Sequence, residues 1–251
     1  MTRLLEADGL DVFHGPLQAL HDVSVAVDEG ETVALIGANG AGKSTLLAAL
    51  AGALPPARGT VRWAGADVTT MPDHRRVRLG VSLTPEGRRL FPSLTVAENL
   101  QVGGRARRPG PWTPDRAYAT FPMVARLRDR RADALSGGER QAVAIARSLM
   151  SNPRVLLLDE VSLGLAPVVI DQLYESLAAV RASGTGLLLV EQDLERAMEV
   201  CDRMYCMLEG RIVLAGRPDE TSRDDIVAAY FGTRPDLRIP IASPPAGGVA
   251  P

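Results

Sequence analysis

One short segment combines the residue types that proteins use to hold phosphate. Residues 36–45 read IGANGAGKST, which fits the pattern G-x-x-x-x-G-K-[ST]. Gly37, Gly40 and Gly42 allow the backbone to turn so that successive N–H groups face a phosphate, where a Cβ atom would crowd the ligand. The helix expected after the loop adds the positive end of its dipole. The segment therefore predicts a phosphate-binding loop.

Lys43 is the only lysine among the 28 lysine and arginine residues of the chain. Its compact ammonium group can lie between the two outer phosphates of a nucleotide, whereas the planar guanidinium of arginine is too wide for the same loop. Ser44 is placed to bind Mg²⁺ through its hydroxyl. The alternative, a glycine-rich turn with an incidental lysine, does not account for the complete motif between a strand and a helix.

Two acidic residues follow a second apolar run. Residues 154–160 read RVLLLDE, so Asp159 stands at the carboxyl end of an expected buried strand and Glu160 comes directly after it. Asp159 could reach Mg²⁺ directly or through water, and Glu160 could polarise a water that attacks the outer phosphate. Adjacent acids are common on surfaces, but at the end of an apolar strand they need a cation or a donor.

A third constellation lies in residues 135–150, LSGGERQAVAIARSLM. Ser136 and Glu139 fit a capping box, which by itself predicts an ordinary amphipathic helix. Gly137 and Gly138 are poor choices for a first helical turn, at a cost of about 1 kcal/mol each relative to alanine. Exposed backbone N–H groups at a helix N-terminus form an anion site. Two phosphate-binding devices in one chain suggest that two chains share nucleotides.

These segments require an α/β framework. Short apolar runs at residues 31–37, 154–160 and 186–192 are typical of strands buried on both faces of a parallel sheet covered by helices. Residues 71–131 contain 13 arginines against 5 acids, with breaks at proline and glycine, and this pattern predicts a basic and mostly helical insertion rather than sheet. The arginines could form a functional patch or a solvated face.

Composition excludes several classes of protein. A length of 251 residues fits one large α/β domain or one domain with an insertion, and a net charge of -2 offers no overall surface for polyanions such as nucleic acid. Cys201 and Cys206 have no metal-binding partners at useful spacing, so buried thiols are expected. No run of 18 apolar residues and no signal-peptide core is present, which predicts a protein that neither spans a membrane nor is secreted.

The phosphate loop, the LSGGE segment and the strand ending in Asp159 and Glu160, in this order, resemble the ATP-binding subunit of ATP-binding cassette (ABC) transporters. The resemblance runs over about residues 3–232. Three finer patterns, TPEGRRLFPSLTVAENL, VSLGLAPVVI and LLVEQD, resemble the branched-chain amino acid import branch. The resemblance implies a P-loop NTPase cassette over residues 1–232, with an antiparallel β subdomain and a helical subdomain inserted at about 87–153. Residues 233–251, rich in proline and glycine, are expected to form a disordered tail.

The resemblance also implies roles for individual residues. Glu86 stands where the family usually has glutamine and could still bind Mg²⁺, with Ser44 and Asp159 as the other metal ligands. Gln192 stands where the family usually has histidine and would act beside the catalytic Glu160 and Lys43. Val161 replaces the usual proline, so we expect some loss of rate. The residues that would bind ATP are Phe13, which would stack on adenine, and Gly37, Asn39, Gly40, Ala41, Gly42, Lys43, Ser44, Thr45, Ser136, Gly137 and Gly138.

In this family two cassettes face head to tail, and each ATP is held by one chain's phosphate loop and the other chain's LSGGE segment. The resemblance therefore implies ATP and Mg²⁺ as cofactors and a second ABC ATPase, identical or related, as partner. It further implies membrane-spanning permease subunits, an indirect solute-binding protein in the periplasm or outside the cell, no nucleic acid, and a peripheral place on the cytoplasmic face of the membrane. Leu90 and Phe91 could contact a permease helix or pack within the insertion.

Other functions fit less well. A chromosome or repair ATPase with this signature needs long heptad arms, which the sequence lacks. A translation-associated cassette protein would carry two cassettes in one chain. A P-loop kinase or small GTPase would leave the LSGGE segment unexplained, and a kinase would transfer phosphate as a monomer. A soluble ABC-type ATPase outside transport remains an alternative.

Overall fold

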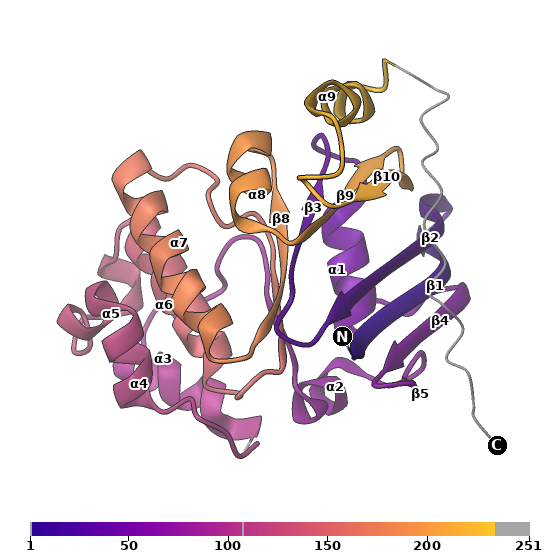
Figure 1. The fold of residues 1–251 in the computed structure, drawn as a ribbon. Helices are drawn as coiled ribbons and strands as arrows, with labels where there is room; N and C mark the ends of the chain where they lie inside the picture. The colour runs from indigo at the N-terminus through magenta and orange to yellow at the C-terminus, as the bar shows by residue number, and fades with distance from the viewer. Residues whose placement is uncertain (1, 107, 234–251) are drawn as a thin grey trace.

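The computed structural model describes residues 2–106 and 108–233. Two β-sheets and the helices around them form the molecule, with most of the helices on one side and an antiparallel sheet on the other (Figure 1). Most of the predicted tail, residues 234–251, lies outside the described residues.

A six-stranded sheet runs through the centre, in the order β10-β9-β3-β8-β7-β6. Its strands are parallel from β9 to β6, and β10 pairs antiparallel to β9. All residues of β3, β7 and β8 are buried, which confirms the three strands predicted from apolar runs. The strands are β3 (Thr32–Ile36), β6 (Val81–Thr84), β7 (Val155–Leu158), β8 (Gly186–Glu191), β9 (Arg203–Leu208) and β10 (Arg211–Gly216).

β6 corrects one prediction. It lies inside the arginine-rich region 71–131, which the sequence pattern assigned to a helical insertion rather than to sheet. The strand is short, and two of its four residues are Ser82 and Thr84, so it lacks the continuous apolar run of its neighbours. Both hydroxyls form hydrogen bonds to the helix α6 (Gly137–Leu149), where Thr84 donates to Ser148 Oγ at 2.8 Å and Ser82 donates to the Ser148 carbonyl at 3.3 Å.

A four-stranded antiparallel sheet, in the order β2-β1-β4-β5, lies beside the central sheet. Together with the helical segments it confirms the fold class expected for a P-loop ABC cassette. The helix α1 (Lys43–Ala51) packs in the same apolar cluster as β1, β2 and β3, so the helix that begins at Lys43 is held from both sheets. The strands are β1 (Arg3–His14), β2 (Leu17–Asp28), β4 (Arg58–Trp63) and β5 (Ala66–Asp67).

The chain between β6 and β7 is helical and packs with α7 (Pro167–Ala182) into a second apolar cluster against β7 and β8. The longest of these helices is α6 (Gly137–Leu149). Its buried residues lie on nearly all sides rather than on the single face predicted, because α3, α5, α7, β6 and β7 all pack against it. The other elements are α3 (Val96–Gly103), η1 (Gly104–Ala106), α4 (Pro114–Thr120), α5 (Pro122–Arg126) and η2 (Ala132–Ala134).

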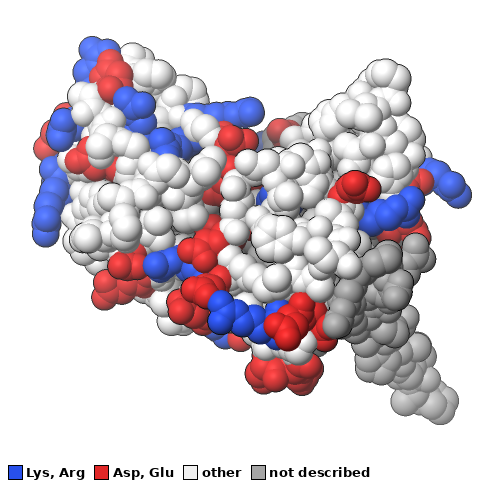
Figure 2. Space-filling model, turned by 90° about the horizontal axis from the view of Figure 1, so that it is seen from above, with Lys and Arg blue, Asp and Glu red and all other residues white. Residues whose placement is uncertain are grey.

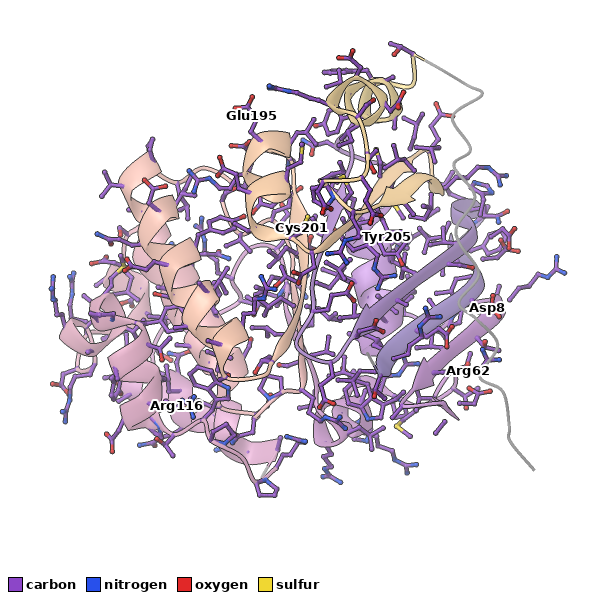
Figure 3. All side chains as sticks on the ribbon, in the orientation of Figure 1. Asp8, Arg62, Arg116, Glu195, Cys201 and Tyr205 are labelled. Carbon is purple, nitrogen blue, oxygen red and sulfur yellow. The ribbon has the colours of Figure 1, made fainter. Side chains whose placement is uncertain are left out.

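Three further helices complete the fold of residues 2–106 and 108–233: α2 (Asp73–Leu79), α8 (Leu194–Val200) and α9 (Arg223–Phe231). The last two pack with β9 and β10 in a third cluster, which also contains two free cysteines: Cys206 is buried, as expected, whereas Cys201 is only partly buried. Tyr205 on β9 joins the two sheets, because its hydroxyl accepts the N–H of Ala26 on β2 at 3.1 Å (Figure 3). The position of β3 and its loop relative to β1 and β2 is thereby held by side-chain hydrogen bonding as well as by packing.

Charges are mixed on the surface. On the face in Figure 2, acidic and basic side chains are interspersed, including at the end formed by the helices between β6 and β7. Arg130 Nη1 lies 3.9 Å from Glu139 Oε1, and Arg131 Nη2 lies 2.7 Å from Asp133 Oδ2. No helix in the described residues is both long enough and apolar enough to span a bilayer.

Candidate nucleotide-binding site

The phosphate loop lies between β3 and α1, at the carboxyl end of the parallel sheet. Gly37 and Gly42 are required by their surroundings as well as by their backbone angles. A Cβ atom on Gly37 would lie 2.3 Å from the Met207 carbonyl oxygen, and one on Gly42, at φ 107°, would lie 2.9 Å from the Ala19 carbonyl oxygen. The loop is therefore pressed against β2 and β9, with Asn39 and Gly40 exposed at its tip.

Lys43 is the first residue of α1 and is only 4% exposed. Its Nζ donates to the carbonyl oxygens of Gly37 and Ala38, at 2.7 and 2.9 Å, so the side chain folds back across the loop. Burial lowers the pKa of Lys43, and the charges of Glu160 and Asp159 oppose that shift. The ammonium group is thus placed inside the turn of the loop and within the field of both predicted acids.

Asp159 follows β7 directly and accepts a hydrogen bond from Ser44 Oγ at 3.1 Å. The carboxylate is 6% exposed, and burial raises its pKa, with further raising by the charges of Glu160 and Glu86 and lowering by the Ser44 hydrogen bond. A hydroxyl and a carboxylate are hard oxygen donors of the kind that Mg²⁺ prefers. The described residues contain no group of three or more His, Cys, Asp or Glu side chains suited to a metal, so these two oxygens fit Mg²⁺ only together with phosphate oxygens or water.

Glu160 and Gln192 are brought together from different strands. Gln192 follows β8, and its Nε2 donates to Glu160 Oε1 at 2.8 Å. Glu160 has φ 49°, a left-handed conformation that costs of the order of 1–3 kcal/mol for a residue with a Cβ atom. Such strain is typical of residues whose direction matters. Val161, which stands where proline was expected, is buried directly after it.

Phe13 and Thr45 lie on two elements that meet beside the loop, the end of β1 and the first turn of α1. Phe13 is near the end of β1 and is 39% exposed, so its ring is available to a flat ligand. The adjacent His14 is within hydrogen-bond distance of Thr45, with 3.1 Å between Nε2 and Oγ1. This contact ties the end of β1 to the first turn of α1. His14 was not among the predicted residues, and nothing in its sequence context distinguishes it.

Glu86 lies in the loop after β6 and is exposed. Its charge raises the pKa of Asp159, which places it within electrostatic range of the Ser44 and Asp159 pair. Within the described residues, the Glu86 carboxylate forms no hydrogen bond to Ser44 or Asp159, which bond to each other. The sheet therefore gathers Lys43, Ser44, Asp159, Glu160 and Gln192, and Glu86 acts on Asp159 through its charge and a backbone hydrogen bond.

The predicted second anion site occupies the start of α6. Ser136 caps this helix with the expected capping box: its N–H donates to Glu139 Oε2 at 2.7 Å, and its Oγ accepts from the Glu139 N–H at 3.4 Å. Packing explains why residue 138 is glycine, since a Cβ atom there would lie 2.4 Å from Val169 Cγ1 on α7. The sequence alone did not show this contact. Gly137 meets only ordinary contacts, so packing does not explain this glycine.

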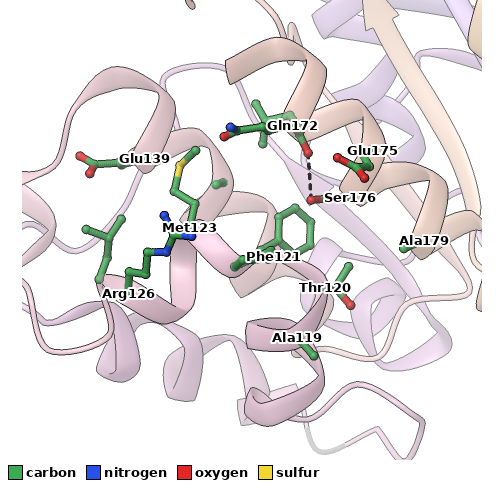
Figure 4. Close-up of a pocket in the computed structure, with 14 residues that line it drawn as sticks. Ala119, Thr120, Phe121, Met123, Arg126, Glu139, Gln172, Glu175, Ser176 and Ala179 are labelled. Carbon is green, nitrogen blue, oxygen red and sulfur yellow. Dashed lines mark hydrogen bonds between the residues drawn. The ribbon is translucent and has the colours of Figure 1, made fainter. Parts of the chain in front are cut away.

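The two predicted anion-binding segments belong to different layers. The helix α1 packs on β1, β2, β6 and α2, whereas α6 packs on α3, α5, α7, β6 and β7. A pocket of ≈ 540 Å³ lies on the α6 side, between α5 and α7, and includes Phe121, Glu139 and Ser176 (Figure 4). This pocket is not the phosphate loop and contains none of the residues predicted to bind ATP.

A buried acid next to the site was missed. Glu191, the last residue of β8, is 1% exposed and accepts hydrogen bonds from Ser162 Oγ, at 2.6 Å, and from the Tyr174 hydroxyl. Burial raises its pKa, and the two hydroxyls lower it. An acid that ends an apolar strand is the same signal that identified Asp159, and it could have identified Glu191.

Comparison with known proteins agrees with this arrangement. The ABC transporter family matches residues 20–162, more than half of the chain. The branched-chain amino acid transport ATP-binding protein BraG of Pseudomonas aeruginosa is 45% identical over 213 residues, covering 84% of this chain and 91% of that protein. The lipopolysaccharide export ATP-binding protein LptB of Acidithiobacillus ferridurans is 33% identical and covers 92% of this chain and 97% of its own length.

The chain belongs to the ABC transporter family. The crystal structure of an ABC transporter cassette in its ADP conformation is 28% identical, with a TM-score of 0.77 over 92% of this chain and 100% of that chain. The ABC fold expected from the motifs is therefore confirmed, and so is the assignment to a nucleotide-binding ATPase subunit. As members of this family are ATPases, the hydrolysis of ATP is the activity that the site serves.

Proposed function

We propose that this ABC subunit hydrolyses ATP to drive the import of branched-chain amino acids or a related small solute. The observation that carries the choice of solute is the 45% identity to a branched-chain amino acid transport subunit, against 33% to a lipopolysaccharide export subunit over a similar share of the chain. The finer sequence patterns around Glu86 and Gln192 support the same branch. ATPase subunits do not need to touch the cargo, so the cargo itself must be tested.

The phosphate loop would hold the nucleotide. Phe13 offers an exposed ring for adenine, and the loop from Asn39 to Thr45 offers backbone N–H groups and the ammonium of Lys43. Ser44, Asp159 and Glu86 would hold Mg²⁺. When bound, this ion supplies positive charge that stabilises the charge developing on the phosphates.

Glu160 would orient the attacking water. Its strained backbone and the hydrogen bond from Gln192 hold the carboxylate in one direction, which is what a residue that positions water requires. Gln192 can donate this hydrogen bond but cannot titrate near neutral pH, so it would hold Glu160 and would not accept a proton itself. Lys43 would balance the charge that develops on the outer phosphates.

Ser136, Gly137 and Gly138 would complete the site of a second cassette, identical or related. Their helix belongs to another layer than the phosphate loop, and Gly137 is free of the packing constraint that explains Gly138. The helical subdomain, at about residues 87–153, would carry this half of the site, while the remainder of residues 1–232 carries the other half. One chain alone would then hold two half-sites.

The partner in the membrane would be a set of multi-span permease subunits, with the ATPase peripheral on the cytoplasmic face and a solute-binding protein as an indirect partner. Phe91 is 46% exposed, and the guanidinium carbon of Arg147 lies 5.8 Å from the centre of the Phe91 ring. Leu90 instead packs partly buried against the second apolar cluster. Of the two residues, Phe91 is the one available to a permease helix.

The test is to purify the tagged chain from detergent-solubilised membranes of its source and to identify by mass spectrometry what accompanies it. We expect two multi-span permeases and a second cassette ATPase. Leucine uptake by cells lacking the chain, restored by the wild type but not by Glu160→Gln, would then establish the cargo. Recovery of the chain without any membrane protein would overturn the transport role. Normal leucine uptake by cells that lack the chain would overturn the assignment of leucine as the transported solute.

A further inference from the structure

Three consecutive residues in the loop after β6 have left-handed backbone conformations. The angle φ is 75° at Gly87, 65° at Arg88 and 40° at Arg89. Because a residue with a Cβ atom rarely adopts this region, two adjacent arginines persist there only if their surroundings hold them. Arg147 on α6 contributes to this, since its Nη1 donates to the Arg89 carbonyl at 2.7 Å and its Nη2 to the Arg88 carbonyl at 3.4 Å. Strain beside a site indicates that the direction of a side chain matters.

The strained backbone directs the side chain of Arg88 at two other segments. Its Nε donates to Oε1 of the buried Gln141 on α6 at 3.1 Å, and its Nη2 donates to the Leu163 carbonyl at 3.5 Å. The guanidinium also lies beside the first residue of α6, because a Cβ atom on Gly137 would lie 3.5 Å from Nη1. One side chain therefore connects the loop after β6, the start of α6 and the segment after β7.

The chemistry of these contacts requires arginine. Both partners are neutral oxygen atoms, one from an amide side chain and one from a backbone carbonyl. A planar guanidinium donates in fixed directions from several N–H groups at once, whereas the single ammonium of lysine on a flexible chain cannot reproduce the same two contacts. Burial and, to a lesser extent, the charge of Arg140 lower the pKa of Arg88, so the contacts are made without support from a neighbouring opposite charge.

We propose that Arg88 is a positioning residue that sets the start of α6 and the segment after Glu160 relative to the Glu86 loop, so that both half-sites form together. The inference rests on the proposed function, in which α6 contacts a nucleotide held by a second cassette. Arg88 would act through α6 and would not touch the nucleotide bound to its own chain. A change at this residue should therefore affect turnover and association rather than nucleotide binding by one chain.

The experiment compares Arg88→Ala and Arg88→Lys with Arg89→Ala in the full chain. Arg89 is the matched control, because it is exposed and has the same left-handed backbone. We expect both Arg88 variants to lower kcat for ATP hydrolysis about tenfold while the KM for ATP stays within about twofold, and Arg89→Ala to leave both unchanged. Equal losses in Arg88→Ala and Arg89→Ala, or full rescue by lysine, would overturn the proposal.

A double-mutant cycle with Gln141→Ala separates positioning from general loss of structure. If Arg88 acts through Gln141, the double variant should be no slower than the worse single variant, whereas independent effects would multiply. If the losses of rate in the two single variants multiply, the proposal for Arg88 is overturned, whereas the proposed ATPase function is not affected. If instead the wild-type chain hydrolyses ATP at a rate per chain that does not depend on association, the shared site fails, and the role of Arg88 fails with it.

Discussion

The ammonium group of Lys43 is shielded from solvent and tied to two carbonyl oxygens of its own loop. These bonds hold the group inside the turn, where burial lowers its pKa and two acids oppose the shift. A nucleotide's phosphates would compete with the carbonyls for the same donor. The residue type could be predicted from the sequence because no other side chain fits this loop, but its carbonyl partners could not, because they depend on the folded turn.

Replacing Lys43 by alanine should raise the Kd for ATP at least about tenfold, because the loop loses its only ammonium donor to the phosphates. Lys43→Arg is the matched variant, since it keeps the charge but widens the group. Titration with a fluorescent ATP analogue measures both. ATP binding as tight as in the wild type by Lys43→Ala would show that the phosphate loop has been assigned wrongly.

Glu160→Gln should keep ATP binding but lower kcat by about 10²- to 10⁴-fold, the usual contribution of a general base. The same variant should accumulate as an ATP-bound dimer, visible by size-exclusion chromatography with ATP. Gln192→Ala should lose less, because it removes a hydrogen bond that holds Glu160 and not the carboxylate itself. Unchanged hydrolysis by Glu160→Gln would remove this residue from the catalytic role.

Glu191 provides a test by pH. Burial raises its pKa in the folded chain, so the folded state holds the proton more tightly than the unfolded state, and stability falls as pH rises from the unfolded pKa through the folded one. Glu191→Gln keeps a similar shape and cannot ionise. The melting temperature of this variant relative to the wild type should therefore rise as the pH increases above the ordinary glutamate pKa of about 4.3. A difference in melting temperature that does not change with pH would show that Glu191 carries no such penalty.

At the scale of elements, strand and helix type followed from the sequence where the apolar run was continuous, as in β3, β7 and β8. β6 was missed because two of its residues are hydroxyl side chains whose partner, Ser148, is distant in the sequence. The helix α6 was predicted with one apolar face, but it packs on nearly all sides, since several elements surround it. Tertiary packing overrode the local pattern in both cases.

The two glycines at the start of α6 should respond differently to alanine. Gly138→Ala should destabilise the fold by about 1–3 kcal/mol, because its Cβ atom would overlap Val169, and adding Val169→Ala should restore most of the loss. Gly137→Ala should keep or raise the melting temperature, because alanine is the better helix former and meets only ordinary contacts there, but it should lower ATP-dependent association. Urea denaturation measures the first effect and size-exclusion chromatography the second. Equal destabilisation by both variants would contradict the division of roles.

At the scale of the whole molecule, the phosphate loop and the start of α6 lie in different layers, and under the proposed function the two segments would act together only across two chains. The family could be predicted from three short motifs because each places its residues at the end of a strand or helix. Arg88, which joins these segments, could not be predicted from the motifs, because its partners on α6 and after β7 are distant in the sequence.

Mixing two inactive variants tests the shared site directly. A Lys43→Ala chain keeps its Gly137 segment, and a Gly137→Ala chain keeps its phosphate loop, so a mixed dimer contains one complete site. We expect each variant alone to hydrolyse ATP at least about tenfold more slowly than wild type, and the equimolar mixture to regain part of the rate. Failure of the mixture to recover, with an active wild type, would show that the two segments do not act across chains.

Because Lys43 is the only lysine of the chain, its reactivity can report on the state of the phosphate loop. With arginine at every other basic position, an amine-reactive label or a protease that cuts after lysine meets one side chain, and that side chain is buried in the phosphate loop. The rate of labelling or cutting then measures how often this loop opens, without any engineered probe. Protection by ATP would read out occupancy of the loop in the purified chain, because every lysine signal from this chain comes from Lys43.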